Sequence, residues 1–348
     1  MASNSAEPRF VLAPMDGMTR PSFRLICFEY GADGATTEMI QSLALGRARR
    51  RLSETFRETL IRFEGEGELA AQLIGSAPEM MGASARKLCA LHRFDAIDIN
   101  MGCPARKVVG SGNGSALMLT PEKAIAVMRA VRDCSGLPVR LKMRLGWDER
   151  HITAPQLASE AAALGFESVT IHGRTRMQLY SGPVDAAAIR AIAEAVPIPV
   201  YANGGVTCAS DALSFLRDTR AAGVAIGRAA LKQPWIFEDI RRLERGEPPR
   251  PHDADERVGA LVRLAELSCM HRPERVAVCE MRKFAAWLLP GLTGYRDVLT
   301  DLNAITTLEE FRRRLEAFLS RLARANDLRV HEAEARGDLD TRRRGMRP

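Results

Sequence analysis

The sequence lacks several features that would assign it directly to a protein class. Its seven cysteines form no CxxC pair and no CxxC…H spacing, so neither a structural zinc site nor an iron–sulfur cluster is expected. It has no run of about 18 apolar residues, and its first residues are polar, without the apolar segment of a secretory signal. These absences predict a soluble cytoplasmic protein with no membrane span and no resident metal ion.

Two phosphate-binding motifs are also missing. The turn after the first expected strand, at 14–18, has no GxGxxG, which argues against an open, doubly wound sheet that binds a dinucleotide. The glycine-rich segment 110–115, GSGNGS, is not followed by Gly-Lys-Ser/Thr, so it is not a P-loop. We interpret this segment as a mobile lid.

Short apolar segments bounded by turn residues alternate with helical patterns, at roughly thirty residues per unit. Thr120 is expected to cap one of the helices with Pro121 in its first turn, and Gly165 is expected to end another in the left-handed conformation. The pattern predicts a closed (β/α)8 TIM barrel, with the open doubly wound sheet as the structural alternative. The eight expected strands are 10–14, 35–38, 69–73, 96–100, 139–143, 168–172, 200–203 and 223–227.

The pattern changes after the eighth unit. Residues 1–245 are expected to form the barrel, and the proline-rich segment 246–252 reads as a linker. Apolar residues at helical spacing predict a small all-helical domain over 253–323. The charged segment 324–348 is expected to be a disordered, solvated tail. A length of 348 residues suits a barrel with such an additional domain. The formal net charge of +7 indicates an acidic partner, and nucleic acid is the first candidate.

The most informative stretch is 96–115, in which a buried strand leads directly into the turn that carries Cys103. Loops after the carboxyl ends of parallel strands carry the chemistry of barrel enzymes, so this cysteine is a candidate catalytic residue. The alternative is that Cys103 is a small buried hydrophobe, as free cysteines often are. Its neighbours are loop-forming residues and not core residues, which favours the catalytic role.

Other polar residues occupy the ends of the expected strands. Lys142 lies in an apolar strand, where an unpaired ammonium is costly, so it is expected to point into the barrel toward an anion or a polarisable ring. The alternatives are that Lys142 extends from the strand end to water, that His172 is a hydrogen-bonded core imidazole, and that Gln72 is structural. The loops after the last two strands predict a phosphate site made by Gly204, Gly205, Gly227 and Arg228.

Six motifs follow one another along the chain: Ala13-Pro14-Met15, Asp98-Ile99-Asn100-Met101-Gly102-Cys103-Pro104, Lys142-Met143-Arg144, His172-Gly173-Arg174-Thr175-Arg176, Asn203-Gly204 and Ile226-Gly227-Arg228. Together they resemble the tRNA-dihydrouridine synthase family. The match covers the barrel and extends into the helical part, through 234–237 and 282–287. The barrel is most similar to the bacterial B-type branch, with a glycine-rich loop similar to that of the C-type branch. It departs from the family at Gly205, where many relatives carry an acidic residue.

The resemblance implies a monomeric FMN-binding enzyme that uses NADPH to reduce a D-loop uridine of tRNA to 5,6-dihydrouridine. Reduced FMN would pass a hydride to C6 of the uracil, and Cys103 would protonate C5. The residues implied to contact tRNA are Asn100, Arg144, Arg174 and Arg176. Those implied to hold FMN are Pro14, Met15, Asp16, Gln72, Lys142, His172, Asn203, Gly204, Gly205, Gly227 and Arg228.

Three other functions compete with this one. The first is an FMN barrel that acts on a free pyrimidine or another small enone, like dihydroorotate dehydrogenases; activity on a free substrate without tRNA would support it. The second is an RNA-binding protein without redox chemistry, which Cys103 and Lys142 disfavour. The third is a Schiff-base aldolase built on Lys142, for which no adjacent acid pair is evident.

Overall fold

The structure is a computed structural model that describes residues 9–47 and 54–324. The chain divides into two compact units, Met1–Arg250 and Pro251–Pro348. The tail expected at 324–348 lies, from residue 325 onward, outside the described residues.

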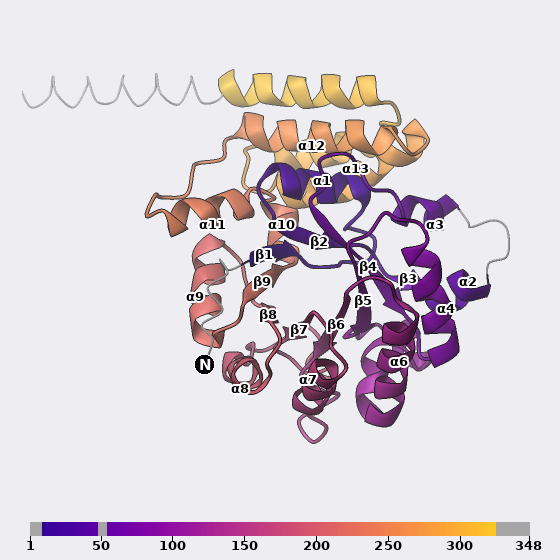
Figure 1. Cartoon of the computed structure of the whole chain (residues 1–348). Coiled ribbons are helices and arrows are strands. Elements are labelled where there is room, and N and C mark those ends of the chain that lie inside the picture. The colour runs from indigo at the N-terminus through magenta and orange to yellow at the C-terminus, as the bar shows by residue number, and fades with distance from the viewer. Residues whose placement is uncertain (1–8, 48–53, 325–348) are drawn as a thin grey trace, which may run out of the picture. The chain divides into compact units, whose positions relative to one another are not determined.

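The first unit is built on a closed parallel β-barrel (Figure 1). In the described residues the hydrogen-bonded order is β2-β1-β9-β8-β7-β6-β5-β4, and pairing of β2 with β4 closes the ring. The short strand β3 pairs with the far end of β4. The strands are β1 (Arg9–Leu12), β2 (Gly34–Thr36), β3 (Ile40–Gln41), β4 (Glu68–Ile74), β5 (Ala96–Met101), β6 (Val139–Arg144), β7 (Ser168–His172), β8 (Val200–Asn203) and β9 (Gly223–Ile226).

Helices surround this barrel (Figure 1). Their buried apolar side chains cover the outer face of the strands. In α4, for example, Met81, Ala85 and Leu88 are buried at helical spacing. The main core therefore lies between strands and helices, where outward-facing residues such as Leu141 and Ile171 are fully buried. The helices are α1 (Pro21–Glu29), α2 (Ser42–Arg47), α3 (Glu54–Thr59), α4 (Pro78–Cys89), α5 (Arg106–Gly110), the 3₁₀ helix η1 (Gly114–Leu119), α6 (Pro121–Cys134), α7 (Ala154–Ala163), α8 (Ala186–Ala195), α9 (Ala209–Thr219), α10 (Arg228–Lys232) and α11 (Ile236–Glu244).

The predicted barrel is confirmed, and one local prediction was wrong. Gly165 does follow α7 with a φ of +74°, and Pro121 does begin α6. Thr120, however, accepts no capping hydrogen bond with its side chain, because its ψ of 74° turns the backbone away from the usual capping geometry. The segment 110–115, which we interpret as a mobile lid, contains the end of α5 and the start of η1, joined by a short turn.

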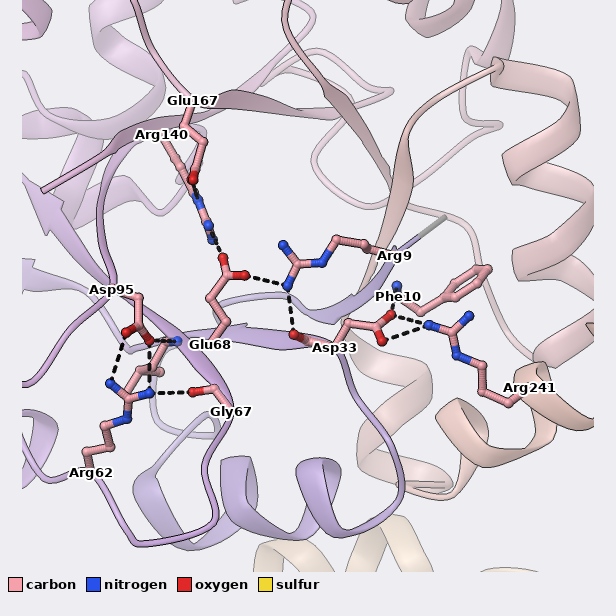
Figure 2. Close-up of polar contacts among 11 residues, drawn as sticks. Arg9, Phe10, Asp33, Arg62, Gly67, Glu68, Asp95, Arg140, Glu167 and Arg241 are labelled. Atoms are coloured by element: carbon pink, nitrogen blue, oxygen red, sulfur yellow. Dashed lines mark hydrogen bonds and ion pairs between the residues drawn. The ribbon is translucent and has the colours of Figure 1, made fainter. Parts of the chain in front are cut away.

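Charged side chains close the amino-terminal end of the barrel (Figure 2). Glu68, at the start of β4, pairs with both Arg9 and Arg140, and Arg140 also pairs with Glu167. Nearby, Asp33 accepts two hydrogen bonds from Arg241 of α11, at 2.6 and 2.7 Å. Further around the ring, Arg62 and Asp95 form an ion pair of 2.9 Å. This end stabilises a barrel, whereas chemistry in such folds occurs at the opposite, carboxyl end.

The second unit is helical in the part that the structure describes. Asp253 caps its first helix by accepting a hydrogen bond of 2.9 Å from the backbone N–H of Glu256. Helices α12 and α13 pack together, and Leu264 and Phe284 are buried. Residues 308–324 are also helical. The three helices with defined ends are α12 (Ala254–Cys269), α13 (Glu274–Leu288) and α14 (Tyr295–Asp301). No helix in the described ranges is long and apolar enough to cross a membrane.

Candidate active site

The register of the barrel gathers the predicted site residues at the carboxyl ends of the strands. Asn100 of β5 is the register partner of Lys142 in β6. Arg144 is the partner of His172 in β7, and His172 is in turn the partner of Asn203 in β8. Because side chains alternate between the two faces of a strand, these residues share the inner face. Sequence spacing placed each of them at a strand end, and the register brings them together.

Lys142 points into the barrel, as predicted. Its ammonium donates a hydrogen bond of 3.0 Å to the side-chain oxygen of Asn203, whose own amide donates to the Ala225 carbonyl at 2.6 Å. Lys142 and Asp98 both line the cavity inside the barrel. Burial lowers the pKa of Lys142 to about 8 and raises that of Asp98 to about 6, and the attraction between the two charges opposes both shifts.

His172 is buried beside a group of cations. Burial, together with the charges of Lys142, Arg144, Arg174 and Arg228, lowers its pKa to about 2, so the imidazole is neutral at neutral pH. Its Nδ1 atom is buried and has no hydrogen-bond partner among the described residues. A buried polar atom without a partner, surrounded by positive charge, is suited to an anionic or strongly polar ligand.

The predicted phosphate loops have the backbone that such a ligand requires. Gly204 and Gly205 have φ angles of +113° and +77°, which are accessible mainly to glycine. A Cβ atom on Gly204 would lie 3.2 Å from His172 Nε2, and one on Gly205 would lie 3.1 Å from Val184. Above Gly227 there is more space, since the nearest atom to an added Cβ, the sulfur of Met15, is 3.7 Å away. Glycine at 205, where the resemblance departs from the family, is thus the residue that this backbone favours.

The other predicted contacts of the cofactor lie around the same mouth. Pro14 lines the barrel cavity, and Met15 approaches Gly227. Asp16 is exposed and lies close enough to Cys103 to affect its ionisation. Gln72 is fully buried, and its side chain hydrogen bonds to Asp98 and Asn100, which leaves one amide hydrogen for a ligand.

Cys103 is held through its backbone on both sides. Its N–H donates to the side-chain oxygen of Asn100 at 2.9 Å, and its carbonyl accepts from the backbone N–H and the hydroxyl of Ser115 at 3.1 and 2.9 Å. Burial raises the pKa of the thiol, while a hydrogen bond from the Ala105 backbone lowers it. The net shift is upward, so Cys103 keeps its proton at neutral pH and can act as an acid.

Arg144 is a buried clamp at the mouth of the barrel. Its guanidinium donates to the carbonyls of Gly102, Thr175 and Leu179, at 2.9, 3.0 and 2.7 Å. It therefore ties the turn that carries Cys103 to the loop that follows β7.

The two arginines after β7 also make intramolecular contacts. Both Nε and Nη2 of Arg174 donate to the Gly182 carbonyl, at 3.0 and 2.7 Å. Arg176 stacks over the ring of Trp147 at 4.6 Å. Arg174 leaves a buried Nη1 atom without a hydrogen-bond partner among the described residues, so it retains a donor for a ligand.

Three residues at this site escaped the sequence reading. Asp98 shares the inner face of β5 with Asn100, a relation that the two-residue spacing could have revealed. Ser115 contacts Cys103 across twelve residues of chain, which no local pattern predicts. Tyr180 is 55% exposed, and two guanidinium groups lie near its ring. That of Arg144 is 5.3 Å from the ring centre, and that of Arg228 is 5.1 Å from it. Its place in a polar loop gave no signal.

The arrangement as a whole can hold an anion and deliver a proton. A cationic, glycine-lined mouth lies beside a neutral thiol, which suits a phosphorylated cofactor and a substrate that needs an acid. No cluster of three or more metal-ligating side chains occurs in the part of the chain that the structure describes.

Comparison with known proteins gives a consistent result. The sequence model of the family described as dihydrouridine synthase (Dus) matches residues 11–323. A probable tRNA-dihydrouridine synthase of Rhizobium leguminosarum bv. phaseoli is 41% identical over 296 residues, which cover 83% of this chain and 89% of that protein. The tRNA-dihydrouridine synthase B of Klebsiella pneumoniae is 35% identical over 329 residues, 90% of this chain and 97% of its own. A probable tRNA-dihydrouridine synthase of Rickettsia conorii is 33% identical over 320 residues, with coverage of 92% and 96%.

Proposed function

The chain belongs to the dihydrouridine synthase family, and from this premise we propose that it is an FMN-dependent tRNA-dihydrouridine synthase. It reduces the C5=C6 bond of a uridine in the D-loop region of tRNA, with NADPH as the reductant. We place this monomeric enzyme in the cytoplasm. The observation that carries the proposal is the neutral thiol of Cys103 beside a cationic, glycine-lined mouth.

The residues at the mouth suit FMN. Gly204, Gly205 and Gly227 would let the backbone approach the phosphate, and Arg228 would add a fixed charge. His172 would use its unpaired Nδ1, and Lys142 would offer an ammonium that burial makes easier to deprotonate. Pro14, Met15, Asp16, Gln72 and Asn203 would complete the site around the ring. When bound, FMN supplies the hydride that reduces C6 of the uracil.

Cys103 supplies the proton. Conjugation with the C4 carbonyl makes the C5=C6 bond electron-poor, so hydride addition at C6 places negative charge toward C5, which then requires an acid. The thiol carries its proton at neutral pH because burial raises its pKa. The hydrogen bond that the Cys103 N–H donates to Asn100 and the one that its carbonyl accepts from Ser115 fix the backbone of Cys103, and so they set where its proton is delivered.

The tRNA reaches this mouth with its target base turned out of the stack, since a stacked base cannot enter a barrel. Asn100, Arg144, Arg174 and Arg176 are the proposed contacts of the RNA. We propose that residues 253–323 form the tRNA-binding domain, joined through the linker 246–252 to the catalytic domain 1–245. A formal net charge of +7 supports a polyanionic partner.

The test is the turnover of purified protein, FMN, NADPH and unmodified tRNA, with dihydrouridine measured by mass spectrometry. Cys103→Ala should retain FMN and tRNA affinity but lose most of its turnover, at least about a hundredfold for a missing general acid. Cys208→Ala is the matched control, since Cys208 lies after β8 and is also partly buried. Unchanged turnover in Cys103→Ala would remove this residue from the acid role. Reduction of free uridine at the same rate as tRNA would favour the small-molecule function instead.

A further inference from the structure

A continuous chain of side-chain hydrogen bonds runs from the barrel interior to the turn that carries Cys103. The carboxylate of Asp98 accepts from the amide nitrogen of Gln72 at 2.7 Å, and the amide oxygen of Gln72 accepts from Asn100 at 2.8 Å. The oxygen of Asn100 then accepts from the backbone N–H groups of Gly102 and Cys103, at 3.1 and 2.9 Å. Asp98, Gln72 and Asn100 are 4%, 0% and 7% exposed, so these bonds are shielded from bulk water.

The direction of every bond in this chain follows from Asp98. An amide group can rotate by half a turn and exchange its donor for its acceptor, but an ionised carboxylate only accepts. Asp98 therefore obliges Gln72 to present its nitrogen on one side and its oxygen on the other. Asn100 must then place its own nitrogen on Gln72 and its oxygen on the turn. Without an acceptor at 98, Gln72 could turn over, and Asn100 would then present N–H groups to the N–H of Cys103.

We propose that Asp98 is a positioning residue for Cys103, which acts by orienting the amides of Gln72 and Asn100. The proposal rests on the proposed function in one respect, that Cys103 is the proton donor. The carbonyl of Cys103 is already held by Ser115, so the chain of amides fixes the other side of the residue. Orientation of both backbone groups holds the thiol at a single place at the mouth.

Asp98 has a second neighbour, Lys142, whose charge interacts with it inside the barrel. A role as counter-ion to Lys142 would require only the negative charge of Asp98. A role in orientation requires an acceptor that contacts Gln72, whichever residue carries the charge. The two roles therefore predict different results when the charge and the amide are exchanged between positions 72 and 98.

The experiment measures alkylation of Cys103 by iodoacetamide in the purified full-length flavoprotein, as a function of pH. The peptide that contains Cys103 is followed by mass spectrometry, and flavin content is recorded by absorbance. Burial is the main cause of the raised pKa of this thiol, so a turn released from Asn100 exposes the thiol and lowers its pKa. Asp98→Leu should therefore be alkylated about tenfold faster at neutral pH, which corresponds to a fall of about one pKa unit.

Two further variants make the result specific. The exchange of Asp98→Asn with Gln72→Glu keeps an acceptor toward Asn100, because the carboxylate at 72 accepts from both amides; alkylation should return to within about twofold of the wild type. Thr170→Val is the matched control, since Thr170 also faces the barrel cavity and is the register partner of Lys142. It should behave as the wild type does.

Three results would overturn the proposal. The first is that Asp98→Leu is alkylated at the wild-type rate. The second is that Thr170→Val is alkylated as fast as Asp98→Leu. The third is that the exchange variant is folded, as judged by circular dichroism, but is also alkylated as fast as Asp98→Leu. Alkylation needs neither tRNA nor NADPH, so it reports on Asp98 even if Cys103→Ala retains turnover and the proposed function fails.

Discussion

Arg144 offers the sharpest test of how the active-site loops are held together. The residue is 2% exposed, and its guanidinium donates to three carbonyls from two loops. Arg144→Met keeps most of the apolar volume but leaves these carbonyls without a donor. The Leu179 carbonyl can regain a partner from water, because Leu179 is 45% exposed. The carbonyls of Gly102 and Thr175 lie deeper, and each costs about 1–3 kcal/mol when left unpaired.

After subtraction of the desolvation cost that the guanidinium itself no longer incurs, the expected loss of stability is about 3 kcal/mol. For a barrel unit of this size that loss lowers the melting temperature by about 6–12 °C. Arg144→Lys should lose about 2 kcal/mol, because one ammonium keeps the charge but cannot reach three carbonyls. Thermal unfolding followed by circular dichroism measures both variants.

The matched control is Arg129→Met, on the exposed face of α6, which should change stability by less than about 0.5 kcal/mol. If Arg144→Met melts within about 2 °C of the wild type, the clamp contributes nothing to stability. If Arg144→Lys is as stable as the wild type, the charge of this residue matters and its three hydrogen bonds do not.

Three more measurements address other parts of the barrel. Burial raises the pKa of Asp98 to about 6, so the folded protein favours the neutral carboxyl, and the wild type loses stability as the pH rises from about 4 through 6. The melting temperature of Asp98→Asn, which cannot ionise at this position, should therefore rise relative to that of the wild type between about pH 4 and 7. A difference that stays constant with pH would contradict the burial of the carboxylate. Asp33 and Arg241 form an ion pair whose side chains are 25% and 26% exposed. A double-mutant cycle with Asp33→Asn and Arg241→Gln, measured by urea unfolding, should give a coupling free energy of about 1 kcal/mol between the two side chains. A coupling free energy of zero would show that the ion pair adds no stability. Gly204→Ala should lower the free energy of unfolding by about 1–2 kcal/mol and retain less flavin on purification, because the φ of Gly204 is +113°. In the control Gly110→Ala the added Cβ meets no atom within 4 Å, so this variant should match the wild type. Equal flavin content in the two variants would argue against a phosphate site at Gly204.

The barrel was predictable because its signal is local. Each strand is a short apolar segment between turn residues, and the expected strands 168–172 and 200–203 coincide with β7 and β8. The features that were missed are short or depend on distant partners. Strand β3 has two residues and exists only because β4 extends beside it. The cap expected from Thr120 failed because the backbone angles of Thr120 itself, which residue type does not fix, depart from the usual capping geometry.

The candidate site was predictable in its members but not in its contacts. Lys142 faces inward as its place in an apolar strand required. Arg144 is a proposed contact of tRNA, but no sequence pattern indicated the three hydrogen bonds that it donates to carbonyls of its own chain. A guanidinium at a strand end can serve either purpose, and only the path of the neighbouring loops decides which carbonyls it reaches.

The sequence by itself determined that Cys103 follows a buried strand and that polar side chains end the strands around it, because both are consequences of neighbouring residues along the chain. The tertiary structure alone decided which of these side chains meet and how dry they are. The register sets Asn100 beside Lys142 and Arg144 beside His172, and closure of the barrel buries them. Burial and neighbouring charge then shift the pKa values of Asp98, Lys142, Cys103 and His172, since ionisation depends on the three-dimensional surroundings of a group and not on its sequence neighbours.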